Sequence, residues 1–174
     1  MWNLCGHWEL QGKSVSQKFF IYSEAYLNSA ESLCEVITNS AEKQNYAQGL
    51  VVLYLTFHAV ELFLKAAILN KEPSEPLNHK IEKYEKRYKN LYPGKRFTLN
   101  IPFETEYIGL QPTEIAEIEA EANITPPDQL NRYPVDRSGK EWNELHAFEP
   151  YTFLKELRNM RENFNSVKNK IIKG

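Results

Sequence analysis

The apolar run at residues 50–69 is the feature that most restricts the fold of this chain. Near its middle lie His58, Glu61 and Lys65. A charged side chain at the centre of a bilayer costs about 2.5–3.5 kcal/mol on insertion scales, so a membrane-spanning helix is disfavoured. A helix that is apolar on nearly every side instead lies in the middle of a bundle. The run therefore predicts a central helix over residues 45–70 of a soluble, cytoplasmic protein with no membrane partner.

Length and composition fit one domain over residues 1–174. The chain is 42% hydrophobic and 25% charged, which is typical of a globular domain. Only seven of its 174 residues are glycines, which argues against all-β folds and glycine-rich phosphate loops. Its two cysteines, Cys5 and Cys34, form no disulfide framework, so a reducing compartment is expected. A formal net charge of −2 excludes a protein that is basic overall but allows a basic patch.

The rest of the hydrophobic pattern predicts four more helices, at residues 14–39, 78–91, 112–122 and 150–172. Pro73 and Pro76 follow the central helix and end it, because proline cannot continue the hydrogen-bond ladder. Apolar residues alternate with polar ones at 96–103, which predicts a short strand or extended segment. A Ser-Gly turn at 138–139 predicts a small hairpin within a long loop. The fold class is therefore all-α, an up-and-down bundle of about five helices with a short extended or hairpin insertion.

Charge is distributed unevenly along the chain. Residues 79–96 carry seven Lys/Arg and two Glu, and residues 155–173 carry six Lys/Arg and two acids. Residues 104–128 carry seven acids and no Lys/Arg. Two basic helices and one acidic insertion predict a molecule with a strongly polarised surface.

His58, Glu61 and Lys65 form the main candidate site. Their spacing of i, i+3 and i+7 puts them on one helical stripe about 60° wide. One interpretation is a polar seam that faces a cleft or partner and binds a phosphate, a base or a second subunit. The other is an i,i+4 Glu61–Lys65 pair at a solvated edge, worth about 0.2–0.5 kcal/mol, beside an ordinary hydrogen-bonded histidine.

Two further sets of polar residues are candidates. Arg132 and Tyr133, in the long loop, either pin that loop to the body or offer an anion contact with a stacking surface. Arg158 and Asn159, in the last helix, are either surface residues or part of an anion site. No set of four metal ligands, nucleophile motif or phosphate loop is visible, so we expect no metal and no cofactor.

Several of these segments together resemble the HEPN family. They are the sequence FHAVELFLKA at residues 57–66, the Asn-His pair at 78–79, Arg-Tyr-Pro at 132–134 and Arg-Asn at 158–159. The resemblance covers most of residues 20–172. It implies a helical bundle, commonly dimeric, of prokaryotic defence, stress or toxin–antitoxin proteins, many of which are ribonucleases.

The chain departs from the active members of that family. These carry an Arg followed after a short gap by a His in the last helix, and the two act on the 2′-hydroxyl and phosphate of RNA. Arg158 matches the Arg, but no histidine follows His146. Proton transfer by a placed side chain typically contributes about 10²–10⁴-fold, so its loss disfavours catalysis by this route.

These observations predict a non-catalytic, homodimeric HEPN-like module that binds RNA or nucleotide and works with a partner protein encoded nearby. One alternative is a metal-independent endoribonuclease that uses His58 or His146. Another is a protein-interaction module. If the chain is the module that binds RNA or nucleotide, we expect Lys65, Arg132 and Arg158 to converge on one pocket, with His58 and Tyr133 on its wall.

Overall fold

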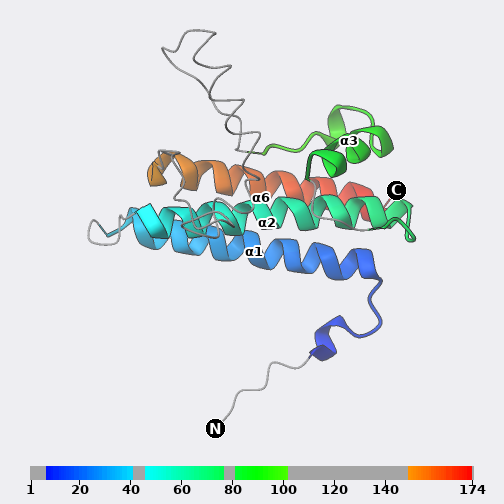
Figure 1. Ribbon diagram of the computed structural model, residues 1–174, viewed down its shortest axis with the longest axis horizontal. Helices are drawn as coiled ribbons and strands as arrows, with labels where there is room; N and C mark the ends of the chain where they lie inside the picture. Colours follow the sequence, from blue (N-terminus) through cyan, green and yellow to red (C-terminus); the bar gives the residue numbers. More distant parts are fainter. Residues whose placement is uncertain (1–6, 41–45, 77–80, 102–148, 174) are drawn as a thin grey trace, which may run out of the picture.

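Three long helices lie side by side and a short fourth one packs across their end. The computed structural model describes residues 7–40, 46–76, 81–101 and 149–173. Its elements are η1 (His7–Leu10), α1 (Val15–Thr38), α2 (Tyr46–Lys71), α3 (Ile81–Leu91), η3 (Lys95–Phe97) and α6 (Pro150–Lys173). Figure 1 shows that α2 runs antiparallel to α1 and in the same direction as α6. The described residues contain no strand, so the all-α class is confirmed for them.

The start of each outer long helix is fixed by side-chain caps. Ser14 Oγ accepts the N–H of Gln17 at 3.2 Å, and Gln17 Oε1 accepts the N–H of Ser14 at 2.9 Å, which forms a capping box at α1. At α6 the Glu149 carboxylate accepts the N–H of Thr152 at 2.6 Å, directly before Pro150. Proline suits a first helical position because its missing N–H has no partner there anyway.

The helix α2 is the buried centre of the bundle, as its sequence predicts. All of residues 59–69 are buried, and α2 contacts α1, α3 and α6. Small residues bring α1 close: Ser23 Oγ donates to the Ala59 carbonyl at 2.7 Å, and Ser16 Oγ donates to that of Ala66 at the same distance. Length and composition alone would let α2 cross a membrane. A mostly buried core helix passes the same test, so this is weak evidence for a span.

The short helix α3 lies on the C-terminal half of α2, and the chain that follows it is held by α6 (Figure 1). Asn163 of α6 clamps this chain with two hydrogen bonds: its Nδ2 donates to the Thr98 carbonyl at 3.0 Å, and its Oδ1 accepts the N–H of Asn100 at 3.1 Å. The residues after α3 are therefore part of the packed body.

Some details differ from the sequence-based predictions. In α2, Val60, Leu64 and Ile68 are fully buried, whereas Leu53 and Leu55 are only half-buried. The reason is that α3 covers only the C-terminal half of α2. The segment 96–103, predicted as a short strand or an extended segment, forms no strand in its described part: residues 95–97 form a 3-10 turn, and Thr98 after it is extended. The predicted helix at 112–122 and the predicted hairpin lie outside the described residues.

Candidate functional site

A chain of buried polar groups runs along α2. Lys65 Nζ donates a hydrogen bond to Glu61 Oε1 at 2.5 Å, and His58 Nδ1 lies 3.4 Å from Glu61 Oε2. Glu61 and Lys65 are 6% and 5% exposed, whereas the His58 side chain is 25% exposed. The predicted stripe is therefore a connected set of groups that reaches solvent at His58. It is not the pair at a solvated edge that one interpretation of the sequence proposed.

The Glu61 carboxylate is held in its charged form. Burial alone would raise its pKa, but the hydrogen bonds from His58 and Lys65 and the charges of both outweigh burial and lower the pKa to about 2. His58 faces this carboxylate with Nδ1, and its other ring nitrogen, Nε2, takes no part in the contact. Glu61 therefore fixes the orientation of an imidazole that presents its second nitrogen away from the ion pair.

Aromatic rings surround both ends of this polar chain. Tyr54 stacks on the His58 ring at 5.9 Å between centroids, and Tyr26 of α1 meets it edge-on at 4.5 Å. At the other end Lys65 Nζ lies 5.4 Å from the ring centroid of Tyr84 in α3. The rings exclude water from the ion pair, and His58 and Lys65 are each held against an adjoining helix.

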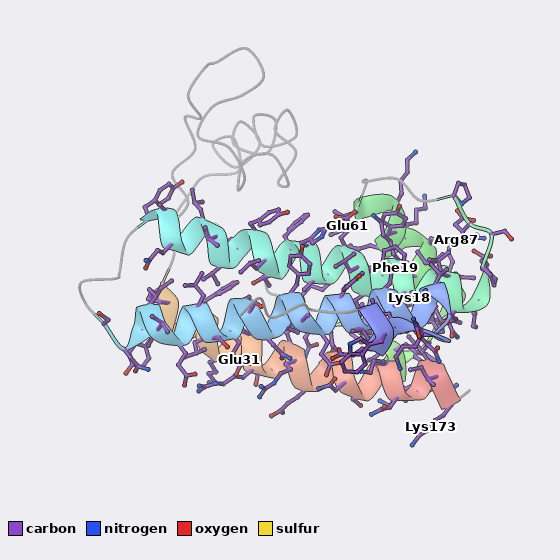
Figure 2. The ribbon with its side chains drawn as sticks, turned by 90° about the horizontal axis from the view of Figure 1, so that it is seen from below. Lys18, Phe19, Glu31, Glu61, Arg87 and Lys173 are labelled. Atoms are coloured by element: carbon purple, nitrogen blue, oxygen red, sulfur yellow. The ribbon has the colours of Figure 1, made fainter. Side chains whose placement is uncertain are left out.

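Arg158 lies in a different place, in the seam between α1 and α6. Its guanidinium contacts Glu31 at 3.3 Å and Glu35 at 3.0 Å, and Arg161 also reaches Glu31, at 3.1 Å. Farther along the same seam Lys168 pairs with Glu24 at 2.9 Å. Figure 2 shows Glu31 at this seam and Glu61 on α2, in separate parts of the bundle. The cation that matches the HEPN Arg is thus already paired with carboxylates of its own chain.

The structure therefore brings together only some of the predicted site residues. His58, Glu61 and Lys65 form one cluster, while Arg158 belongs to the α1–α6 seam and its neighbour Asn159 is exposed to solvent. Arg132 and Tyr133 lie outside the described residues. The expected meeting of Lys65 with Arg158 is not seen, because the two side chains leave their helices toward α3 and α1 respectively.

A groove that the sequence reasoning missed lies between α3 and the chain that follows it. It has a volume of about 640 Å³ and an apolar floor that includes Leu64, Tyr88, Tyr92 and Phe97. The one signal in the sequence was the recurrence of tyrosine at 84, 88 and 92, which marks an apolar stripe on a basic helix. The Pro-Gly pair at 93–94 predicts the end of α3, but no pattern in the sequence predicted that the chain after it packs back beside the helix to form a groove.

Basic side chains gather near this groove. Lys170 of α6 donates to the Arg96 carbonyl at 3.2 Å, which joins the end of the second basic helix to the chain that follows the first. Lys89, Lys95 and Arg96 are all exposed there. Arg87 of α3 is paired with Glu72 and contributes less free charge.

In the described part of the chain, no three His, Cys, Asp or Glu side chains lie close enough together to hold a metal ion. Cys34 is buried in the core, where loss of hydration raises its thiol pKa to about 11.

In comparisons with known proteins, no family model, no curated protein and no solved structure matched the chain. The resemblance to the HEPN family accordingly stays a prediction.

Proposed function

We propose that this chain is a non-catalytic, HEPN-like helical module that binds RNA or nucleotide in a prokaryotic defence, stress or toxin–antitoxin setting. The observation that carries the proposal is the junction of the two basic helices, where Lys170 meets the backbone of Arg96 beside exposed Lys89 and Lys95. Clustered cations of this kind neutralise phosphates, and RNA binding then weakens steeply with added salt. Arg158, already paired with Glu31 and Glu35, supports a role without catalysis.

The proposal is tested by titrating labelled single-stranded RNA at several salt concentrations. Arg96→Glu and Lys170→Glu, at the two sides of the junction, should each weaken binding and lower the slope of log affinity against log salt by about one. Lys155→Glu is the matched control, because it changes the same charge near the start of α6, far from the junction (Figure 1). If all three variants bind RNA as the parent protein does, the basic junction is not an RNA surface.

A second candidate function is a metal-independent endoribonuclease that uses His58. The observation in its favour is the contact with Glu61, which orients the imidazole as the carboxylate of a catalytic histidine–carboxylate pair would. We expect purified protein to leave single-stranded RNA intact for hours, with or without divalent metal. Cleavage that is lost in His58→Gln but kept in Arg158→Gln would establish this second candidate. The alternative histidine, His146, lies outside the described residues.

The partners belong to the same proposal. A homodimer is supported by apolar side chains exposed on α1 and α2, among them Tyr22, Tyr46 and Val51 at 48%, 53% and 45%. Light scattering at micromolar concentration should then report about twice the chain mass of 20.4 kDa. A cytoplasmic location and a partner protein encoded nearby complete the proposal. If the chain binds a protein but no RNA, it is an interaction module instead.

A further inference from the structure

The groove between α3 and residues 93–101 has walls that are fixed by hydrogen bonds. Tyr88 Oη donates to the Phe97 carbonyl at 2.6 Å, and Tyr92 Oη donates to the Ala67 carbonyl at 2.8 Å. Asn163 holds the backbone on both sides of Leu99, as described above. Helices α3 and α6 thus hold this short segment in place, and Tyr92 anchors the end of α3 to α2. A site whose walls are held in this way needs little reorganisation when a ligand enters.

The lining of the groove combines apolar surface with positive charge. The rings of Tyr88, Tyr92 and Phe97 form its floor, and half-buried Leu99 and Ile101 form one side. Lys89 and Lys95 stand at the mouth, and the lining includes one acid, Glu85, which lies 3.8 Å from Lys89. The guanidinium of Arg96 covers the Phe97 ring at 4.7 Å and adds positive charge nearby.

We propose that this groove binds a small aromatic anion, with its ring against the apolar floor and its anionic group at Lys89 and Lys95. Its volume falls within the roughly 300–1,000 Å³ usual for small-molecule sites. An aromatic ligand matches a floor of three rings, which prefer edge-to-face or offset ring contacts. The two lysines at the mouth favour an anion, because each carries a positive charge and offers three hydrogen-bond donors and no acceptor. The site is separate from the buried His58 cluster, but Lys89 and Lys95 also belong to the proposed RNA-binding surface, so a variant that fills the groove without changing charge is needed to separate the two.

The probe for this proposal is anilinonaphthalene sulfonate, an aromatic anion whose fluorescence rises in apolar surroundings. We expect one equivalent to bind the folded protein. Lys95→Glu should weaken binding about tenfold or more, since an attraction becomes a repulsion. Lys86→Glu is the matched control, because this lysine is exposed on the same basic segment but does not line the groove.

A second pair of variants tests the cavity itself. Thr98 is exposed and lines the groove, so Thr98→Trp should fill it and abolish dye binding. Asn100→Trp adds the same ring next to the groove and should leave binding intact. Circular dichroism and the melting temperature verify that each variant is folded.

Competition identifies the source of the ligand. Displacement of the dye by a nucleoside monophosphate indicates a nucleotide, and displacement by an aromatic carboxylate indicates a metabolite of that class. The proposal is overturned if neither compound displaces the dye, or if Lys95→Glu and Thr98→Trp bind it like the parent protein. Thr98→Trp is expected to keep its RNA affinity, so this proposal and the proposed RNA binding can fail independently.

Discussion

Two ionic clusters in this molecule use similar residues in different surroundings. Glu61 and Lys65 on α2 are almost completely buried, with His58 as their link to solvent. The seam between α1 and α6 has more ion pairs. Its Glu31 is also buried, but the two arginines that pair with it, Arg158 and Arg161, are 47% and 41% exposed. A buried charge loses its favourable interaction with water. The attraction of a nearby opposite charge offsets this loss only while both members of the pair are present. The contrast teaches that the number of ion pairs says little about their energetic weight.

The sharpest way to break the comparison is to remove one member of the buried pair. Lys65→Met would leave the Glu61 carboxylate buried without the ammonium group that donates to it. We expect it to lower the free energy of unfolding by about 3–5 kcal/mol, measured by chemical denaturation. The control is the double variant Glu61→Leu/Lys65→Met, which removes both charges and should be about as stable as the parent protein. A small effect of the single variant would mean that water reaches Glu61.

Acid should reveal the same cluster through linkage. Glu61 has its pKa lowered from 4.5 to about 2, so the unfolded chain binds its proton first as the pH falls. The stability due to Glu61 is therefore complete above about pH 4.5 and is lost as the pH falls toward 2, by about 3 kcal/mol. Denaturation curves measured between these limits should be less pH-dependent for Glu61→Leu/Lys65→Met. Equal slopes for the two proteins would contradict the lowered pKa.

Replacing His58 tests the residue through which the buried cluster reaches solvent. His58→Gln should cost about 1–2 kcal/mol, because it weakens a hydrogen bond to a charged carboxylate and removes two ring contacts. The loss is smaller than for Lys65 because His58 is already partly solvated. Thermal unfolding measures the effect, and Tyr22→Phe, on an exposed tyrosine of α1, is a suitable control. A loss as large as that of Lys65→Met would place His58 among the buried partners.

The seam should give the smallest effect. Arg158→Met is expected to change the free energy of unfolding by about 0–1 kcal/mol, because the Arg158 side chain is about half-exposed and the buried Glu31 keeps Arg161 as a partner. The measurement is chemical denaturation at low and high salt, and added salt should reduce even this difference. A loss of several kcal/mol would show that Glu31 depends on Arg158 and that the two clusters are energetically alike.

Much of the helical framework was predictable from local signals. The apolar periods of residues 14–39 and 150–172 and the prolines after α2 placed three long helices to within one or two residues. Such signals are local, because caps and periodicity act within a few turns of chain. The cluster of His58, Glu61 and Lys65 was predictable for the same reason, since its members share one face of one helix.

The surroundings of these residues were not predictable in the same way. The sequence could not tell whether Glu61 and Lys65 face solvent or core, because that depends on where α3 packs. The sequence also predicted that Arg158 shares a pocket with Lys65. In the structure Arg158 pairs instead with Glu31 and Glu35 of α1, more than 120 residues earlier in the chain. Both outcomes depend on which helix lies beside which, and helical period carries no information about neighbours.

The sequence by itself determined where the helices of α1, α2 and α6 begin and end, because backbone hydrogen bonding and side-chain caps are local. It also determined that α2 is the core helix, since none of the other described helices is apolar all round. Only the tertiary structure decided that one ion pair is buried and another solvated, and that α3 and the chain after it enclose a groove. Burial and shape are properties of several elements packed together, and the cost of a charge or the fit of a ligand follows from that packing.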